Sequence, residues 1–428
     1  MPDEDIIVIG AGIAGLAAAR SLTEAGFAPT VLEGRDRIGG RIWTDRSLGM
    51  PLDLGASWIH GISRNPLMDL VRDHGIKTRR TFLGALALYD ADGRLLDEEE
   101  MNRIDALGEE ISAALLELKQ AADSDRPLAA AIADILALRD LDDSQKQSIN
   151  WHLFSEIELE HGADLADLSL RAFDEDDFFR GPDVVFPAGY VQIVDHLASG
   201  LHIKLGHSVH QINYGAQGVE VATAQGLFTA DRAVVTLPLG VLQSGDVQFS
   251  PALPAAKLDA IQRLQMGTAN KIALHFSERF WPEWPHYMGQ LSETTGTAME
   301  FWNMDMYIGQ PVLFALTRGA HARALEQLAE EEMVERAMAD LRHIFGNDLA
   351  DPLASVSTRW HADPFARGAY SHVPPGATMG DYDLIAAPVE NRLFFAGEAT
   401  NRQYPATVHG ALLSGRREAE IIVGLATA

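Results

Sequence analysis

The feature that most constrains the fold is a glycine-rich turn near the beginning of the chain. A β-branched run over residues 5–9 has the composition of a buried parallel strand, and it leads directly into a Gly-x-Gly-x-x-Gly pattern over residues 10–15. An apolar helix is predicted to follow over residues 16–25. In such a turn the first glycine allows a tight bend, the second lets a pyrophosphate approach the backbone, and the third lets helix and strand pack closely. The pattern therefore predicts a dinucleotide site at Gly10, Gly12, Ala14 and Gly15.

The residues that follow this unit narrow the choice of ligand. A second strand ends at Glu33, which follows Gly15 by 18 residues. This is close to the roughly 20 residues expected before a carboxylate that binds a ribose hydroxyl. Arg35, Gly39, Gly40 and Arg41 come next, and a fork of guanidinium groups suits a diphosphate. We predict a permanently held dinucleotide, FAD, bound by Glu33, Arg35, Gly40 and Arg41.

Composition limits the class of protein and its partners. The chain has 428 residues, 47% of them hydrophobic, and a formal net charge of −27, which disfavours nucleic acid and anionic membranes and favours small cations. Cysteine is absent, so the FAD is expected to be noncovalent. We expect no metal, no membrane span and, by elimination, a cytoplasmic location, whereas the oligomeric state is left open.

Strand and helix patterns alternate along the chain, and a long helical stretch interrupts the nucleotide-binding pattern. We therefore predict an α/β fold with a Rossmann-type, glutathione-reductase-like FAD-binding domain that is discontinuous in sequence. A second, α+β substrate-binding domain is expected to contain a sheet flanked by helices. The FAD-binding domain is predicted to comprise residues 1–80, 187–275 and 355–428, and the substrate-binding domain residues 81–186 and 276–354.

Two segments permit both a structural and a functional interpretation. In the strand predicted over residues 270–276, the apolar residues alternate on one face, so that Lys271 points to the other face. On residue types alone, this is an ordinary exposed strand lysine. Four carboxylates over residues 174–177 lie beside three phenylalanines. Such a run is typical of a solvated surface, but acid flanked by aromatic rings can also bind an extended cation.

Five separated motifs make the chain similar to the flavin-containing amine oxidases. They are the N-terminal unit and the segments 53–58, 270–271, 367–371 and 397–415. The likeness runs nearly from end to end and is strongest for the branch of polyamine oxidases and LSD-type lysine demethylases, in particular for bacterial-type soluble polyamine oxidases. The long helical hairpin of the demethylases is missing, which argues against a histone substrate.

The resemblance implies roles for individual residues. Lys271 would hold a water near flavin N5, and Tyr370 and Thr407 would occupy the two cage positions beside the flavin. Ala369 stands where monoamine oxidases carry a covalent cysteine. Further FAD contacts are implied for Ser57, Trp58, Val209, Trp360, Glu398, Thr407 and Val408. The candidates for binding the substrate are His60, Glu156, Asp174, Asp176 and Tyr370.

The implied reaction is oxidation of a C–N bond of a polyamine. A hydride would pass from the carbon beside the nitrogen to flavin N5, the imine would hydrolyse to aldehyde and amine, and O2 would reoxidise the flavin to give hydrogen peroxide. Three alternatives stay open: oxidation of a monoamine, amino acid or alkaloid on the same fold, a flavin desaturase, and a noncatalytic flavin-binding protein.

Overall fold

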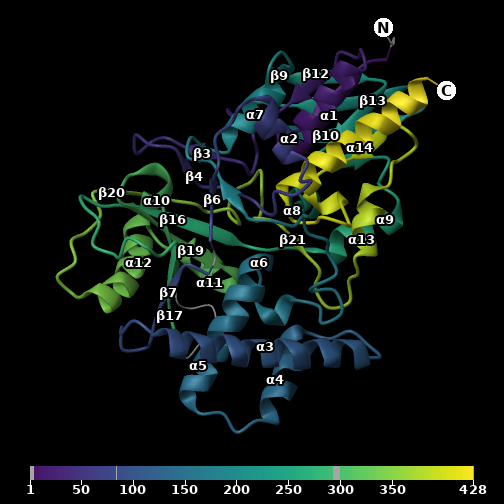
Figure 1. Cartoon of the computed structure of the whole chain (residues 1–428). Coiled ribbons are helices and arrows are strands. Elements are labelled where there is room, and N and C mark those ends of the chain that lie inside the picture. The colour runs from purple at the N-terminus through teal and green to yellow at the C-terminus, as the bar shows by residue number, and fades with distance from the viewer. Residues whose placement is uncertain (1–3, 83, 293–298, 428) are drawn as a thin grey trace.

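Two large sheets and a layer of helices organise the computed structural model, which describes residues 4–82, 84–292 and 299–427. A parallel sheet lies in the part of the molecule that contains both termini, and a mixed sheet lies between it and the helical layer (Figure 1). The predicted combination of a Rossmann-type part with an α+β part is therefore confirmed.

The parallel sheet has five strands in the order β22-β13-β1-β2-β9. All its neighbouring strands run parallel. The β-branched run forms β1, which is buried along its whole length because it lies in the middle of the sheet. The strands are β1 (Ile6–Ile9), β2 (Thr30–Leu32), β9 (His202–Lys204), β13 (Arg232–Val235) and β22 (Leu393–Phe395).

Helix α1 (Ile13–Glu24) connects β1 to β2 and packs against the C-terminal helix α14 (Val408–Ala426). Their approach requires glycine, because a Cβ on Gly415 would lie 2.1 Å from the carbonyl oxygen of Ala14. The C-terminal helix α14 thus belongs to the same structural unit as β1 and α1 at the beginning of the chain. The surrounding elements are α2 (Leu67–Asp73), α7 (Val191–Ala198), α8 (Leu239–Ser244), α9 (Ala255–Arg263), α13 (Gly380–Ala386), β10 (Val209–Gly215), β11 (Gly218–Thr223), β12 (Gly226–Ala230) and β14 (Gln248–Ser250).

The mixed sheet has six strands in the order β20-β16-β19-β18-β17-β7. The sequence division assigns β16 to the nucleotide-binding part, but β16 hydrogen-bonds to β19 and β20 of this sheet. The strands are β7 (Leu86–Tyr89), β16 (Ala269–His275), β17 (Tyr287–Gln290), β18 (Glu300–Asn303), β19 (Val312–Arg318) and β20 (Ala354–Ser357).

Both faces of the mixed sheet are covered. Helix α12 (Glu330–Phe345) packs on the face that carries Ile272 and Leu274. The opposite face carries Ala273 and Trp302 and packs against the loops around Leu54. The expectation of an exposed Lys271 is therefore wrong, because the face opposite the apolar residues of β16 is also buried.

The predicted helical stretch forms the layer below the mixed sheet (Figure 1). Its helices are α3 (Glu98–Ala121), α4 (Leu128–Ala137), α5 (Asp143–Leu153), the π-helix η1 (Phe154–Glu158) and α6 (Leu159–His161). Capping boxes at Asp97 and Asp142 begin α3 and α5. The remaining elements are β3 (Thr44–Asp45), β4 (Leu52–Asp53), β5 (Trp58–Ile59), β6 (Arg79–Arg80), β8 (Val184–Val185), β15 (Gln265–Met266), β21 (Ser371–His372), α10 (Asp305–Ile308), α11 (Gly319–Leu325), η2 (Leu165–Asp167) and η3 (Glu398–Thr400).

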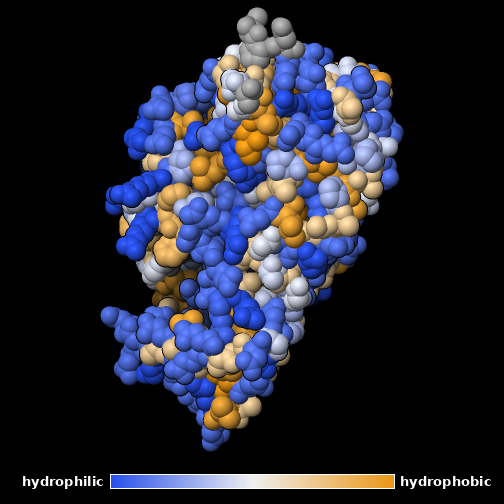
Figure 2. All heavy atoms as spheres, turned by 90° about the vertical axis from the view of Figure 1, so that its right-hand side faces the viewer, coloured by the Kyte–Doolittle hydropathy of each residue, from blue (hydrophilic) through white to orange (hydrophobic). Residues whose placement is uncertain are grey.

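The surface carries hydrophobic residues only in small separate groups on the face shown in Figure 2. Among the described residues, no helix combines the length and the apolar character needed to cross a bilayer. The same residues contain no cluster of His, Asp and Glu that could hold a metal ion.

Candidate functional site

A single cavity of about 1060 Å³ extends from the glycine turn to the helical layer. Most of the residues predicted from the sequence line it. These are Gly10, Gly12, Ala14, Glu33, Arg35, Gly40, Arg41, Ser57, Trp58, His60, Glu156, Asp176, Val209, Lys271, Trp360, Tyr370, Glu398, Thr407 and Val408. Gly15 lies behind the turn and Asp174 lies outside the cavity, so these two predicted residues are not among its lining residues.

The glycine turn leaves space where a phosphate group can approach. Gly10 has a φ of +101°, which favours glycine, and a Cβ on Gly15 would lie only 2.0 Å from the carbonyl oxygen of Gly10. Gly12 differs, because a Cβ there would meet no atom within 4 Å. Gly12 is also the N-cap of α1 and has no capping side chain, so that backbone N–H groups of the first turn can bind an anion. The turn therefore fits the pyrophosphate of FAD.

The acidic and basic residues beside the turn are already paired within the chain. Glu33 accepts hydrogen bonds from the backbone N–H groups of Ala11, at 2.7 Å, and Arg35, at 2.9 Å. The guanidinium of Arg35 donates both Nη groups to Asp363, at 2.7 and 2.8 Å. This bidentate pair holds Arg35 in the cavity wall. The ribose and phosphate roles of these residues stay predictions.

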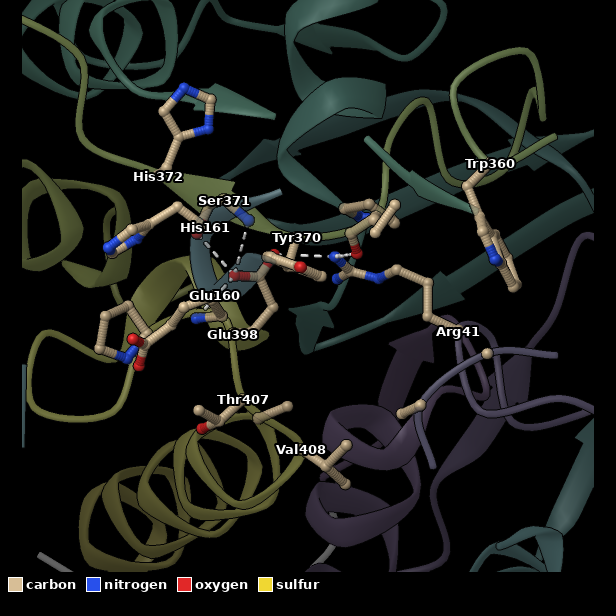
Figure 3. Close-up of a pocket in the computed structure, with 18 of the residues that line it drawn as sticks. Arg41, Glu160, His161, Trp360, Tyr370, Ser371, His372, Glu398, Thr407 and Val408 are labelled. Carbon is tan, nitrogen blue, oxygen red and sulfur yellow. Dashed lines mark hydrogen bonds and ion pairs between the residues drawn. The ribbon is translucent and has the colours of Figure 1, made fainter. Parts of the chain in front are cut away.

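Glu398 follows β22 at the carboxyl end of the parallel sheet and joins three segments, and Figure 3 shows it between Arg41 and Ser371. Its Oε1 accepts from Arg41 Nη1 at 2.8 Å, and its Oε2 accepts from Ser371 Oγ at 2.6 Å and from the Ala406 N–H at 3.1 Å. The next residue, Thr407, caps α14 by accepting from the Gly410 N–H at 3.0 Å. The N-terminus of α14 is thereby held at the cavity, where its positive end can stabilise negative charge on a reduced flavin.

Lys271 lies on the cavity-facing side of β16 and is buried. Its Nζ donates to the carbonyl oxygens of Asp53 and Gly55, each at 2.7 Å, and contacts the hydroxyl of Ser57. Burial lowers the pKa of Lys271 to about 7, although the nearby charge of Asp53 opposes this shift. Asp53 is itself buried, and burial raises the pKa of its carboxyl to about 6. Lys271 can therefore exchange a proton near neutral pH, at the position where the family resemblance implies a bound water.

Tyr370 forms a wall of the cavity, and its hydroxyl donates to the carbonyl oxygen of Leu159 at 3.1 Å. Burial raises the pKa of this phenol to about 12, so Tyr370 stays neutral at physiological pH. Arg318 also binds the Leu159 carbonyl, through Nε at 3.3 Å. Sequence reasoning missed Arg318 and Glu300. The available signal was a charged residue within an otherwise apolar strand, which is unusual unless the residue faces a cavity.

The predicted carboxylate run divides into two environments. Asp176 lines the cavity together with Glu156 and Glu160, and burial raises the pKa of both Asp176 and Glu160. Asp174 instead forms an ion pair with Lys119. The prediction of Asp174 as a substrate-binding residue is therefore wrong in this structure, because its carboxylate points away from the cavity towards α3.

His60 lines the cavity and belongs to its more exposed part, since 62% of its side chain is accessible to solvent. Its Nδ1 is 2.8 Å from Oδ2 of Asp183, whose other oxygen accepts from the N–H of Gly61. Asp183 therefore orients the imidazole of His60, and it adds a further carboxylate to the cavity that the sequence did not reveal.

Comparisons with known proteins agree with this architecture. Residues 13–423 match the family described as flavin containing amine oxidoreductase. Polyamine oxidase 2 of Arabidopsis thaliana is 36% identical over 97% of this chain and 87% of that protein. Lysine-specific histone demethylase 1 homolog 1 of Oryza sativa is 38% identical over 99% of this chain but only 52% of that protein. The chain thus spans about half the length of the demethylase homologues that it matches.

Solved structures share the fold at lower sequence identity. A putrescine oxidase double mutant aligns with a TM-score of 0.79 and 21% identity, covering 98% of this chain and 99% of that one. Cyclohexylamine oxidase from Brevibacterium oxydans aligns with a TM-score of 0.79 and 20% identity over 100% of both chains. The family match and the identity to the curated relatives establish that this chain belongs to the flavin-containing amine oxidoreductases.

Proposed function

We propose that this chain is an FAD-dependent amine oxidase that acts on a polyamine of the spermine and spermidine class. The observation that supports this proposal most directly is the charge of the cavity beyond the glycine turn. Its described lining residues include Lys271 and Arg318 as cations against the carboxylates of Asp105, Glu156, Glu160, Asp176, Asp177, Asp183 and Glu300. An apolar cavity rimmed with carboxylates attracts a substrate that carries several ammonium groups.

The side chains around the cavity would orient the amine and exclude water. Bound FAD would supply the acceptor for a hydride from the carbon next to the reacting nitrogen. Tyr370 and Thr407 would flank that nitrogen, while Lys271 would hold or transfer a proton between Ser57 and a water. The amine must be neutral, and deprotonating an alkylamine of pKa near 10.4 at neutral pH costs about 4 to 5 kcal/mol.

The relatives support amine oxidation more strongly than any particular amine. Several curated relatives are called polyamine oxidases, and one structural neighbour is called a putrescine oxidase. Demethylase homologues are equally similar in sequence, and cyclohexylamine oxidase, named for a monoamine, is equally similar in fold. A monoamine, amino acid or alkaloid is therefore the alternative substrate on the same fold.

The experiment that tests the substrate class is a comparison of kcat/KM for peroxide release with spermine, spermidine, putrescine, benzylamine and several amino acids. We expect spermine or spermidine to exceed benzylamine by about tenfold or more, because each extra ammonium finds a carboxylate in the cavity. A higher kcat/KM for benzylamine or for an amino acid would refute the polyamine class and leave amine oxidation standing.

Two neighbouring aspartates offer a matched pair of variants. Asp176→Asn is expected to raise the KM for spermidine about tenfold, because a carboxylate that lines the cavity is lost, and to leave the KM for benzylamine unchanged. Asp174→Asn removes the same charge outside the cavity and serves as the control, with an unchanged KM for both amines. Equal effects of the two substitutions would show that only the overall charge of the protein matters.

A further inference from the structure

Two charged residues of the mixed sheet, Glu300 and Arg318, lie on the same face as Lys271. In the register of the sheet, Leu316 of β19 pairs with both Lys271 of β16 and Glu300 of β18. Arg318 follows Leu316 by two residues and therefore points to the same side. All three charged residues line the cavity. The sheet thus presents one carboxyl side chain and two basic side chains, Lys271 and Arg318, to the space in which a substrate would bind.

Arg318 has unused hydrogen-bonding capacity in a buried position. The residue is only 8% exposed, and its Nη1 has no hydrogen-bond partner among the described residues. Its guanidinium lies 5.5 Å from the centre of the Phe154 ring, and it forms no ion pair within the described part of the chain. Burying a guanidinium without a carboxylate partner is costly, so its charge acts on whatever occupies the cavity.

Glu300 is the acidic residue whose charge acts most strongly on Arg318. It is 7% exposed and lines the cavity, and no hydrogen bond or ion pair involves its carboxylate within the described residues. Burial raises the pKa of Glu300, and the charge of Arg318 opposes this rise. The two charges therefore influence each other across the cavity wall without neutralising each other by contact.

The guanidinium lies near Tyr370, where the proposed function places the reacting nitrogen. Arg318 Nε and Tyr370 Oη donate to the same carbonyl oxygen, that of Leu159, at 3.3 and 3.1 Å. A nitrogen placed beside Tyr370 is consequently close to the positive charge of Arg318. The other titratable groups around this position are Lys271 on β16, Tyr287 on β17, Glu300 on β18, Glu156 and Glu158 on η1, and Glu160 and His161 on α6.

We propose that Arg318 excludes the protonated amine from the reacting position, so that the nitrogen beside Tyr370 binds in its neutral form. A like charge within about 4 to 6 Å shifts the protonation equilibrium of an amine by about one to three pKa units. The proton passes to solvent as the amine binds, and no base on the chain is needed. Glu156, Glu160 and Asp176 hold any further ammonium groups farther along the cavity. This inference rests on the proposed amine oxidation, but not on a polyamine as the substrate.

The first test is the pH dependence of anaerobic flavin reduction by spermidine, or by benzylamine if only monoamines react. The limiting rate constant at saturating amine, which reports ionisation within the complex, is expected to rise with pH. In Arg318→Met this rise moves to higher pH by about one unit, so that the value near pH 7 falls about tenfold and recovers in alkali. Arg318→Lys keeps the positive charge and is expected to return the profile towards that of the wild type.

Glu300→Gln provides the opposite change on the same face of the sheet. Removing this negative charge is expected to move the rise to lower pH, because a protonated amine then loses its nearby counter-ion. A purely structural role of Arg318 predicts a lower rate at every pH with an unmoved profile. That outcome, or a shift of both variants in the same direction, would overturn the proposal.

The second test measures proton release without turnover. Spermidine is titrated into the photoreduced holoenzyme under anaerobic conditions by calorimetry, in two buffers of different ionisation enthalpy. The wild type is expected to release more protons per bound spermidine than Arg318→Met does. Equal release would contradict the proposal. If no amine reduces the wild-type flavin, the proposed function fails, while this titration still decides the effect of Arg318 on amine protonation.

Discussion

Replacing Lys271 with methionine is expected to slow flavin reduction or flavin reoxidation by about 10²-fold, whereas FAD stays bound. The Lys271 Nζ is held by two carbonyl oxygens and a hydroxyl, which fixes its position in the cavity wall. Loss of one preorganised donor of this kind typically costs 10²- to 10³-fold in rate. Stopped-flow measurement of the two half-reactions identifies which one depends on Lys271. Unchanged rates for both would make Lys271 a structural residue.

A second buried lysine serves as the control for this substitution. Lys257 is 3% exposed, donates to the carbonyl oxygen of Leu384 at 3.0 Å and does not line the cavity. Burial lowers its pKa to about 7, as it does for Lys271. Lys257→Met therefore removes an equally buried amine at a distance from the proposed chemistry. Both half-reactions are expected to keep their wild-type rates in this variant.

The rates of the two half-reactions measured by stopped flow are also expected to depend on pH, because Lys271 titrates. With a pKa of about 7, Lys271 is protonated in weak acid and neutral in weak alkali. The half-reaction that depends on its charge is expected to change rate through this range in the wild type. In Lys271→Met the change should disappear, whereas in Lys257→Met it should remain. A change that persists in Lys271→Met would assign the titration to another group.

The second large effect is expected from Gly12→Val, which should weaken FAD binding by about 10²-fold or more while the protein still folds. A Cβ at Gly12 meets no protein atom within 4 Å, and the backbone there is in the extended region, so the protein itself tolerates a side chain. The added methyl groups would occupy the space through which the pyrophosphate approaches the backbone. Titration of the apoprotein with FAD and thermal unfolding of the apoprotein measure the two properties separately.

Two other glycines define the controls for this substitution. Gly15→Ala places a Cβ 2.0 Å from the carbonyl oxygen of Gly10 and is expected to lower the unfolding temperature of the apoprotein. Gly215→Val, in β10, adds a side chain where no atom lies within 4 Å and outside the cavity. It should change neither stability nor FAD affinity. Normal FAD affinity in Gly12→Val would place the pyrophosphate elsewhere.

The local parts of the fold could be predicted from the sequence because they depend on neighbouring residues. The β-branched run, the glycine turn and the first helix follow each other directly and form β1 and α1. The pairing of Arg35 with Asp363 could not be predicted, because the two residues lie 328 positions apart and no local pattern links them. The residue types thus predict an FAD site, but they do not predict the ion pairs within it.

The solvent exposure of the side chains at the site, and the direction in which they point, were the properties least predictable from the sequence. Alternation along β16 correctly sets Lys271 apart from the apolar residues, but it cannot show that a second buried layer covers that side. Asp174 and Asp176 belong to one acidic run, and only tertiary packing points one towards Lys119 and the other into the cavity. The sequence did not indicate Arg318, because its proposed role depends on neighbouring strands and on the carbonyl of Leu159.

Anaerobic mixing of the FAD-loaded protein with spermidine tests whether the acidic cavity places an amine against the flavin in a geometry that allows oxidation. We expect the visible absorbance of the oxidised flavin to bleach on mixing and to return with release of hydrogen peroxide when O2 is admitted. A flavin that stays bound and oxidised in the presence of spermidine, putrescine and benzylamine alike would contradict amine oxidation in this cavity.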